Sequence, residues 1–407
     1  MSDYFDDLET RSEDERISSL AECLPAQIAA AKALPGYAKT LGGVDPDAFA
    51  WREALVDLPV LRKADLTSAQ AAHPPFGGYT AWQGAQFDQI FQSPGPIYEP
   101  ASVSTNWWRM GRFLYACGIG EGDIVQNCFG YHLTPAGMIF ENGARAVGAT
   151  VLPAGTGQTE LQARAAHDIG VTAYAGTPDY LKVILDKAEE MGLDLSRITR
   201  AAVSGGALFP SLRQEYADRG ISCLQCYATA DLGNIAYESP AMEGMIVDEG
   251  VVVEIVRPGT GDPVPDGEVG EVVVTTLNKD YPLIRFATGD LSAVLPGISP
   301  CGRTNMRIKG WMGRADQTTK IKGMFVRPEQ VADLVARHPE VLKARVIAGR
   351  EGEMDTMTVQ LETEATDPGA YADSIAAVLK LKGKVDLVAP GSLPNDGKVI
   401  DDQRSYD

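Results

Sequence analysis

Several segments of this sequence place glycines beside hydroxyl, aromatic or acidic side chains, each directly after a short apolar run. They are Phe129-Gly130-Tyr131-His132, Pro153 to Gly157, Gly176-Thr177-Pro178, Ser204-Gly205-Gly206-Ala207 and Tyr227-Ala228-Thr229-Ala230-Asp231. Glycine lets a ligand approach the backbone, hydroxyl groups donate hydrogen bonds, and a carboxylate such as Asp231 can hold a cation. Together these segments predict a site for a nucleotide-sized ligand, and the alternative is ordinary turn chemistry between strands and helices.

The spacing of the cysteine, histidine and serine residues gives little support for a redox site, a zinc site or a protein nucleophile. Cys223 and Cys226 form a C-x-x-C pair, but the pair falls inside an apolar run typical of a strand, and no second pair accompanies it. We therefore favour two small residues in a packed strand over a redox or zinc site. No Ser-His-Asp or Cys-His set suggests a protein nucleophile.

The elements that would position these segments are clearest between residues 124 and 230. Strands are expected at 124–129, 149–153, 171–175, 198–203 and 221–227, and helices at 135–148, 159–169, 178–191 and 210–219. Thr177, Pro178 and Gly192 are suitable start and stop residues for the third of these helices. The alternation predicts an α/β fold with a parallel sheet flanked by helices, in which ligands bind at the carboxyl ends of the strands.

The pattern changes after residue 240. Two apolar strands are expected at 250–256 and 269–276, joined by a turn-rich stretch, which indicates an antiparallel β section. A glycine- and charge-rich stretch at 310–323 precedes a short segment in which helix and strand alternate again. We expect a large N-terminal domain, residues 1–315, and a small α+β C-terminal domain, residues 316–407.

The composition excludes several classes of partner. The chain has 407 residues and a formal net charge of −19, which disfavours binding to nucleic acid or to acidic membrane surfaces. The acidic N-terminus does not resemble a signal peptide, no stretch is long and apolar enough to span a membrane, and the six cysteines lack the spacing of a disulfide framework. We expect a cytoplasmic protein.

Motifs along nearly the whole chain resemble the phenylacetate–CoA ligase family of the adenylate-forming superfamily. They occur in the family's order at 125–131, 149–160, 282–291, 300–304 and 313–316. The resemblance implies the adenylate-forming enzyme fold. It also implies ATP-dependent, AMP-forming activation of a small carboxylic acid, with ATP, Mg²⁺ and coenzyme A as cofactors.

The resemblance also implies roles for single residues. Residues expected to bind ATP are Ser93, Gly95, Ser204, Gly205, Gly206, Tyr227, Ala228, Thr229, Asp290 and Arg314. Tyr227 would stack near the adenine, Asp290 would accept hydrogen bonds from the ribose hydroxyls, and Asp231 would hold Mg²⁺ near the phosphates. Asp316 would be the hinge of the small domain, and Lys398 the catalytic lysine.

One segment departs from the family. The family's phosphate loop resembles Ser-Ser-Gly-Thr-Thr-Gly-Lys-Pro, whereas this chain has Ser93-Pro94-Gly95-Pro96-Ile97-Tyr98-Glu99-Pro100. Proline removes backbone donors that could hold phosphate, and Glu99 stands where the family has lysine. Ser93, Gly95 and Tyr98 could still donate to phosphate.

The sequence therefore leaves three functions open. The first is an acid–CoA ligase; the second is a nucleotide- or acyl-adenylate-binding homologue without turnover; the third is an adenylating enzyme that transfers its acid to a carrier protein or an amine. The acid, aryl or arylacetic by the family's name, would bind near Phe129, Gly130, Tyr131 and His132. The family often forms homodimers, but no segment identifies an interface.

Overall fold

The computed structural model describes residues 3–82, 86–93, 95–206, 208–315, 317–322, 324–351, 354–394, 396 and 398–404. The chain divides into two compact units. Unit 1 contains Met1–Val253, Val274–Phe286 and Leu295–Gly310, and unit 2 contains Glu254–Val273, Ala287–Val294 and Trp311–Asp407. The predicted hinge, Asp316, lies outside the described residues, so the hinge and the domain boundary beside it stay predictions.

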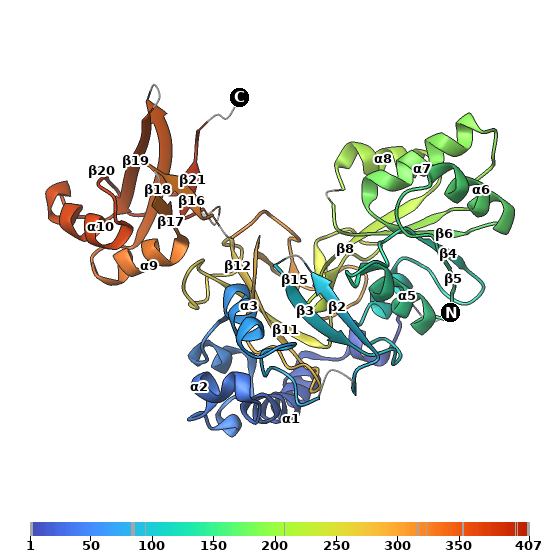
Figure 1. Cartoon of the computed structure of the whole chain (residues 1–407), viewed down its shortest axis with the longest axis horizontal. Coiled ribbons are helices and arrows are strands. Elements are labelled where there is room, and N and C mark those ends of the chain that lie inside the picture. Colours follow the sequence, from blue (N-terminus) through green and yellow to red (C-terminus); the bar gives the residue numbers. More distant parts are fainter. Residues whose placement is uncertain are drawn as a thin grey trace. The chain divides into compact units, whose positions relative to one another are not determined.

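Unit 1 is built on a nine-stranded mixed sheet (Figure 1). In spatial order its strands are β14 (Val294–Leu295), β15 (Arg307–Ile308), β10 (Met245–Val247), β9 (Gly233–Tyr237), β8 (Ser222–Thr229), β7 (Arg200–Val203), β6 (Ala173–Gly176), β4 (Ile124–Asn127) and β5 (Thr150–Pro153). The five strands from β5 to β8 are parallel, and β9, β10 and β15 continue the sheet in antiparallel pairs. The parallel sheet expected from the sequence is confirmed.

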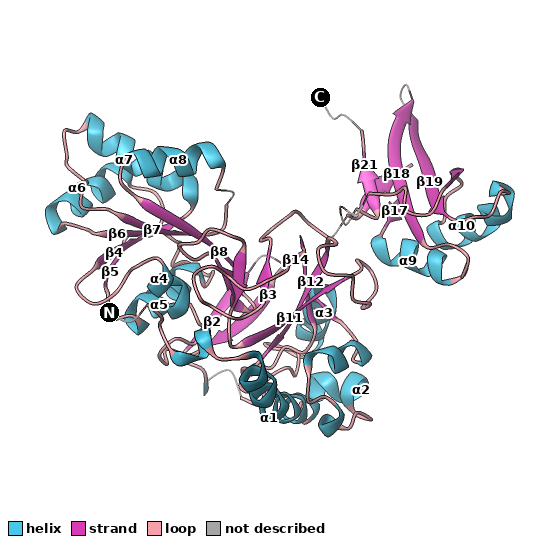
Figure 2. Ribbon diagram, turned by 180° about the vertical axis from the view of Figure 1, so that it is seen from behind, coloured by secondary structure: helices cyan, strands magenta, loops and turns pink. Residues whose placement is uncertain are grey.

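Helices cover both faces of the parallel strands, as expected (Figures 1 and 2). They are α4 (Gly111–Ala116), α5 (Ala136–Ala146), α6 (Thr159–Ile169), α7 (Pro178–Glu190) and α8 (Pro210–Asp218). Two separate apolar cores result. Ala173, Ala175 and Ala202 pack with α4 and α5, whereas the alternate residues Tyr174 and Ala201 pack with α6, α7 and α8.

The N-terminal part of unit 1 supplies further helices and a hairpin. The helices are α1 (Glu13–Lys32), α2 (Ala38–Leu41) and α3 (Lys63–Ala72), with 3-10 turns at Asp7–Thr10, Pro35–Tyr37, Pro46–Ala48 and Arg52–Asp57. Strands β2 (Gln89–Ser93) and β3 (Ile97–Ala101) pair in antiparallel fashion. This hairpin contains the segment that departs from the family's phosphate loop.

A second sheet has the order β1-β13-β12-β11, and the division between the two units runs through its strands. The strands are β1 (Leu61–Arg62), β13 (Phe286–Ser292), β12 (Gly270–Thr276) and β11 (Val251–Val256). The last two match the strands expected at 269–276 and 250–256. They are almost fully buried along their length, which explains their continuous valine runs.

The C-terminal part of unit 2 has its own apolar core. A four-stranded sheet has the order β20 (Lys384–Val388), β19 (Met354–Glu362), β18 (Lys343–Glu351) and β21 (Ile400–Asp402). Helices α9 (Pro328–Ala336) and α10 (Ala372–Leu379) pack on it, and β16 (Thr319–Ile321) and β17 (Met324–Val326) form a hairpin (Figure 2). The α+β pattern expected here is present.

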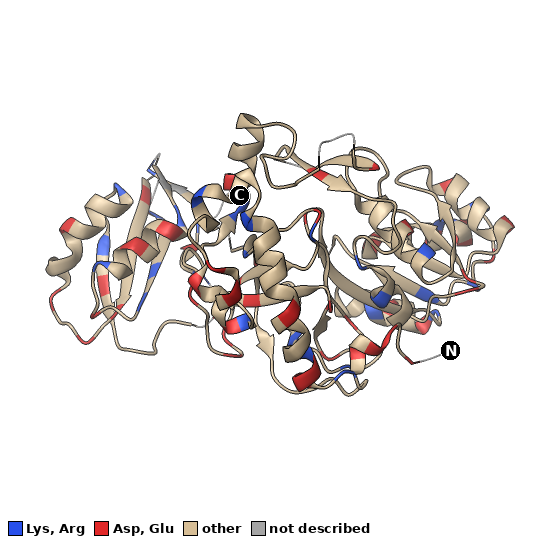
Figure 3. Ribbon diagram, turned by 90° about the horizontal axis from the view of Figure 1, so that it is seen from below, with Lys and Arg blue, Asp and Glu red and all other residues tan. Residues whose placement is uncertain are grey.

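The distribution of charge and the hydrophobicity of the helices are relevant to which partners the protein can bind. Acidic residues number 55 against 36 basic residues, and Figure 3 shows the acidic positions distributed along the whole chain rather than in one segment. No helix in the described part of the chain combines the length and hydrophobicity needed to cross a membrane.

Candidate active site

The turn after β7 lies against strand β8 near the carboxyl edge of the parallel sheet. The Ser204 hydroxyl donates a hydrogen bond to the Cys226 carbonyl at 3.0 Å, and the Gln225 amide donates to the Gly206 carbonyl at 2.9 Å. Gly205 has a φ of +71°, a conformation that favours glycine. These contacts bring the two segments expected to hold the adenine together.

The residues expected to bind the acid follow β4 at the same edge. The Phe129 ring stacks on Phe140 with a centroid separation of 4.2 Å, so it belongs partly to the core. A Cβ atom on Gly205 would lie 3.8 Å from the Phe129 ring. The segments that follow β4 and β7 therefore approach each other, although β6 lies between the two strands in the sheet. Tyr131 accepts a hydrogen bond from Asn127 at 2.7 Å, and burial raises the pKa of its hydroxyl. His132 is exposed.

Asp231 follows β8 and is buried, with a side chain 1% exposed. Its Oδ2 accepts a hydrogen bond from the Lys63 ammonium at 3.0 Å, and its Oδ1 has no partner among the described residues. Lys63 is the first residue of α3, 168 positions earlier in the chain. A carboxylate with one unsatisfied oxygen fits the role of a magnesium ligand.

The hairpin β2–β3 directs Glu99 inward rather than toward solvent. Glu99 is 2% exposed, and its Oε1 accepts a hydrogen bond from the Ser93 hydroxyl. Burial, and next the charge of Asp231, raise the pKa of Glu99 to about 8. Ser93 therefore points its hydroxyl at Glu99. Gly95 lies in the turn between the strands, and its neighbour Pro94 is outside the described residues.

The hairpin is fixed to two other parts of unit 1. The Gln70 side chain of α3 accepts a hydrogen bond from the Tyr98 backbone N–H and donates one to the Tyr98 carbonyl, both at 2.8 Å. The Gln92 N–H donates to the Leu133 carbonyl at 2.9 Å. The hairpin thus lies beside both the C-terminal end of α3 and the loop that carries His132.

Asp290 and Arg314 come together in unit 2. Arg314 donates to Asp290 Oδ1 at 2.9 Å, and the Trp311 indole donates to the same oxygen at 3.1 Å. The two backbones also form an antiparallel bridge. A Cβ atom on Gly289 would lie 2.8 Å from the Arg314 guanidinium, so the glycine of the Thr-Gly-Asp motif makes room for the arginine. The structure therefore brings together two residues predicted to bind the nucleotide, and their roles toward the ribose and phosphate stay predictions.

Lys398 lies in the C-terminal part of unit 2, just before β21. Its side chain is 53% exposed and pairs with Asp401 at 3.1 Å. Gln317, the residue after the predicted hinge, accepts hydrogen bonds from the backbone N–H groups of Val399 and Ile400 at 2.6 and 2.8 Å. The segment that bears the lysine is thus tied to the chain next to Asp316.

Sequence reasoning missed three of these residues. Lys63, Trp311 and Gln317 lie in no recognised motif. Two of their contacts join positions 168 and 82 residues apart, and a single sequence carries no local signal for such pairs. For Trp311 the sequence did offer a signal, a tryptophan between two glycines close to Arg314. The structure shows that this tryptophan is exposed, which is unusual for so large an apolar side chain.

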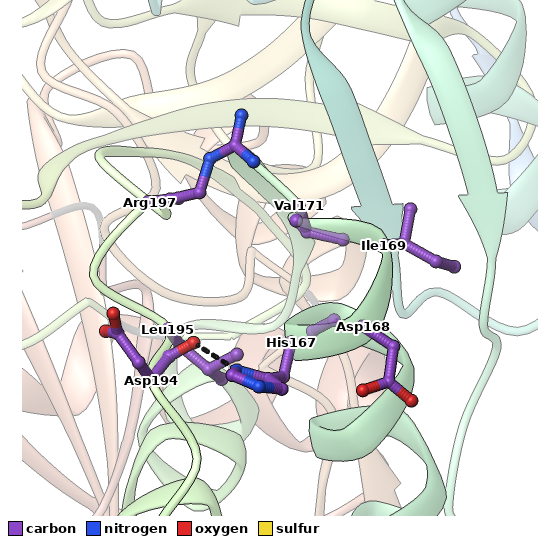
Figure 4. Close-up of a pocket in the computed structure, with 9 residues that line it drawn as sticks. His167, Asp168, Ile169, Val171, Asp194, Leu195 and Arg197 are labelled. Atoms are coloured by element: carbon purple, nitrogen blue, oxygen red, sulfur yellow. Dashed lines mark hydrogen bonds between the residues drawn. The ribbon is translucent and has the colours of Figure 1, made fainter.

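Two other features lie away from this edge of the sheet. Cys223 and Cys226 are free thiols buried in β8, and burial raises both pKa values to about 12, in agreement with the packed-strand interpretation. A cavity of about 180 Å³ is lined by His167, Asp194, Arg197 and neighbours (Figure 4). It lies where α6 ends and the chain enters β6, the edge opposite to the candidate site, and contains none of the predicted site residues.

The fold and the site define a class of protein, the AMP-binding enzymes: residues 108–278 match the family of that description. The particular family follows from whole-length similarity. The chain is 30% identical over 353 residues to the phenylacetate-coenzyme A ligase of Thermus thermophilus, covering 82% of this chain and 78% of that protein. It is 31% identical over 340 residues to the Escherichia coli phenylacetate-coenzyme A ligase, covering 79% and 75%. The chain belongs to the phenylacetate–CoA ligase family.

A solved structure shows the same fold. A 2-hydroxyisobutyryl-CoA ligase in complex with 2-HIB-AMP and CoA aligns with a TM-score of 0.71 and 24% identity, covering 99% of this chain and 93% of that one. The adenylate-forming enzyme fold expected from the sequence is confirmed.

Proposed function

We propose that this chain is an AMP-forming acid–CoA ligase, which activates a small carboxylic acid with ATP and transfers the acyl group to coenzyme A. The observation that carries the proposal is Asp290, paired with Arg314 at 2.9 Å in a chain that matches phenylacetate-coenzyme A ligases over four-fifths of its length. The substrate is an aryl or arylacetic acid, by analogy with the names of those relatives.

The first half-reaction joins two anions. An oxygen of the substrate carboxylate attacks the α-phosphorus of ATP, the bond to the β-phosphate oxygen breaks, and pyrophosphate leaves. Asp290 orients the nucleotide through the ribose hydroxyls, Arg314 contributes positive charge nearby, and the Lys398 ammonium stabilises the charge that develops on the phosphate oxygens. Mg²⁺, held by Asp231, would neutralise phosphate charge.

The second half-reaction needs no nucleophile from the protein. The thiol sulfur of coenzyme A attacks the acyl carbon, the bond to the phosphate oxygen breaks, and AMP leaves with the electron pair. We propose that residues 316–407 rotate about Asp316 between the two steps, so that Lys398 withdraws and the thiol gains access. The acid would bind near Phe129 and Tyr131. A cytoplasmic location and a homodimer complete the proposal.

A second candidate is a homologue that binds acyl-adenylate without turnover. It is favoured by the hairpin, where Ser93 donates to Glu99 and a second carboxylate, Asp231, interacts electrostatically with Glu99. The pKa of Glu99 is about 8, so Glu99 would add its repulsion of a triphosphate to that of Asp231 only as the pH rises toward and above that value.

Pyrophosphate release with ATP, Mg²⁺ and a panel of carboxylic acids separates these candidates. Release with at least one acid is expected, and an acyl-CoA product should require CoA. A chain that binds an acyl-adenylate analogue but releases no pyrophosphate with any acid would favour the second candidate. Release without CoA-dependent product would indicate transfer to a carrier protein or an amine.

The role of Lys398 is tested by Lys398→Ala. Adenylation should fall by about 10²- to 10³-fold, because an ammonium that stabilises the transition state is lost, while binding of an acyl-adenylate analogue stays unchanged. Lys384→Ala is the matched control, because Lys384 is also an exposed lysine paired with an aspartate in unit 2. Wild-type pyrophosphate release by the Lys398 variant would refute the assignment.

A further inference from the structure

Lys63 places an ammonium group beside the carboxylate that follows β8. Its Nζ donates to Asp231 Oδ2 at 3.0 Å, although the two residues lie 168 positions apart in the chain. The Asp231 side chain is 1% exposed, whereas that of Lys63 is 39% exposed. An ammonium has three N–H donors, and among the described residues Asp231 accepts from one of them. The ammonium is therefore anchored by the protein and still accessible to a further acceptor.

Helix α3, which carries this lysine, is fixed at both ends. Lys63 is its first residue and follows β1 directly, where the Leu61 N–H donates to the Arg285 carbonyl at 2.9 Å. Near the other end of the helix, Gln70 makes two hydrogen bonds of 2.8 Å with the Tyr98 backbone of the hairpin β2–β3. One helix thus positions the ammonium and supports the hairpin that occupies the place of the family's phosphate loop.

The hairpin has no cationic side chain of its own. Residues 89–101 contain neither lysine nor arginine, and Glu99 stands where the family's loop has lysine. Burial, and next the charge of Asp231, raise the pKa of Glu99 to about 8, whereas the Ser93 hydroxyl and the charge of Lys63 oppose that rise. The Lys63 ammonium therefore lies close enough to Glu99 for the two groups to interact. The positive charge absent from the hairpin is present beside it, on α3.

A second cation in this region is already engaged by the protein. Arg109 lines a small cavity together with Asp231. Its side chain is 14% exposed, pairs with Asp248 and donates to the Leu232 carbonyl. Lys63 is more exposed and has a single hydrogen-bond acceptor among the described residues, so it is the better placed of the two cations to bind an anion.

The first half-reaction of the proposed function requires such a cation. When the bond between the α-phosphorus and the β-phosphate oxygen breaks, the electron pair stays on that oxygen, and the leaving pyrophosphate gains negative charge. An ammonium that donates hydrogen bonds to the leaving phosphates stabilises this charge. Because Asp231 holds the ammonium through one donor, its other two donors are available for phosphate oxygens.

We propose that Lys63 binds the terminal phosphates of ATP and stabilises the leaving pyrophosphate, and that it thereby replaces, from α3, the lysine of the family's phosphate loop. The inference deepens the proposed function and rests on it for the reaction, but binding of the triphosphate can be measured separately. Lys63 acts in the first half-reaction alone, because pyrophosphate has left before coenzyme A attacks.

Equilibrium binding to the full-length chain tests this role. The probes are AMP and an ATP analogue with a methylene group between its α- and β-phosphorus atoms, each titrated by calorimetry at a fixed Mg²⁺ concentration. Lys63→Gln loses the charge, but its amide can still donate to Asp231. The variant should bind the analogue about 10- to 100-fold more weakly and bind AMP, which lacks the terminal phosphates, as the wild type does. Lys63→Arg keeps the charge and should bind the analogue more tightly than Lys63→Gln.

Lys182→Gln is the matched control, because Lys182 is 40% exposed and also pairs with carboxylates in unit 1. It should bind both probes as the wild type does. AMP binding by Lys63→Gln shows in the same experiment that the variant is folded. The role is wrong if Lys63→Gln binds the analogue as tightly as the wild type, or if Lys63→Arg and Lys63→Gln weaken its binding equally. Equal weakening of both probes would also refute it, because Lys63 would then act only by compensating the charge of Asp231.

The two half-reactions separate this proposal from the proposed function. Lys63→Gln should slow pyrophosphate release by about 10²-fold and leave unchanged the rate at which a supplied acyl-adenylate is converted to acyl-CoA. A wild type that releases no pyrophosphate with any acid, while Lys63→Gln alone loses affinity for the analogue, would overturn the ligase and support the role of Lys63. Normal analogue binding and normal pyrophosphate release by Lys63→Gln would overturn the role of Lys63 and support the ligase.

Discussion

Two aspartates that the sequence assigns to the nucleotide site sit in contrasting surroundings. Asp290 pairs with Arg314 at 2.9 Å and Asp231 pairs with Lys63 at 3.0 Å. Asp290 Oδ1 accepts two donors, and the arginine is 55% exposed. Asp231 is more deeply buried, has one oxygen without a partner among the described residues, and lies near a second carboxylate. The two aspartates therefore differ in how many of their carboxylate oxygens are hydrogen-bonded by the protein.

The nitrogen–oxygen distances of 2.9 and 3.0 Å alone would not distinguish the two ion pairs, so the difference lies in their surroundings. At Asp290 the partner lies 24 residues away and is held by a backbone bridge, so the local chain supplies the arrangement. At Asp231 the neighbours come from α3 and β3, far earlier in the chain. The contacts of the first region are made by nearby residues of the chain, whereas those of the second come from distant segments and leave one Asp231 oxygen without a partner among the described residues.

The largest expected effect is a pH-dependent gain of stability in Glu99→Gln, measured in the presence of a chelator. The folded state raises the pKa of Glu99 from 4.5 to about 8, so the folded chain holds a proton that the unfolded chain releases. Wild-type stability should therefore fall as the pH rises from about 5 to about 8. Because glutamine carries no charge, the variant should exceed the wild type by about 2–4 kcal/mol at pH 8 and by little at pH 5.

Urea unfolding at pH 5, 6.5 and 8 measures this difference. Glu160→Gln is a suitable control, because Glu160 is 73% exposed and its removal should leave the pH dependence unchanged. If the free energies of unfolding of the wild type and Glu99→Gln changed equally with pH across this range, the argued difference between the two regions would be wrong.

An intermediate effect is expected when each aspartate loses its cation. Lys63→Met leaves the buried Asp231 without its ammonium, and the free energy of unfolding should fall by about 1–2 kcal/mol; the 39% exposure of Lys63 keeps the loss below that of a fully buried pair. Arg314→Met removes a more exposed cation, and Trp311 still donates to Asp290, so the loss should stay below about 1 kcal/mol.

Chemical denaturation of the two variants side by side tests the ranking. Equal losses, or a larger loss in Arg314→Met, would show that burial does not separate the two pairs as argued.

The sequence predicts most of the framework. The apolar runs and helix signals between residues 124 and 230 match β4 to β8 and α5 to α8 to within a few residues, because burial on both faces produces continuous apolar strands. Helix ends are less certain. Thr177 is the N-cap of α7, yet its side chain makes no capping hydrogen bond. Pro178 at the first helical position is sufficient to start the helix.

The candidate site is predictable only in part. The residue types pointed to Asp231, whereas Asp290, and Glu99 as a departure from the family pattern, were found through the family resemblance. The burial of Glu99 and its closeness to Asp231 were not, because they follow from how β3 and α3 pack on the rest of unit 1. The replacement of the family's lysine by Glu99 can be interpreted only once the residues that surround Glu99 in the structure are known.

The smallest expected effect is that of Trp311→Phe on the more complete of the two aspartates. The indole donates one hydrogen bond to Asp290 Oδ1 at 3.1 Å, and Arg314 continues to hold that oxygen in the variant. Losing one partly exposed hydrogen bond costs about 0.5–1 kcal/mol, which corresponds to a two- to five-fold rise in KM for ATP with kcat unchanged. Trp51→Phe is the matched control, because Trp51 is similarly exposed and lies outside the site. A fall in kcat with constant KM would mean that Trp311 acts on the chemical step instead of on the position of Asp290, and the Asp290 region would then be less complete than its contacts indicate.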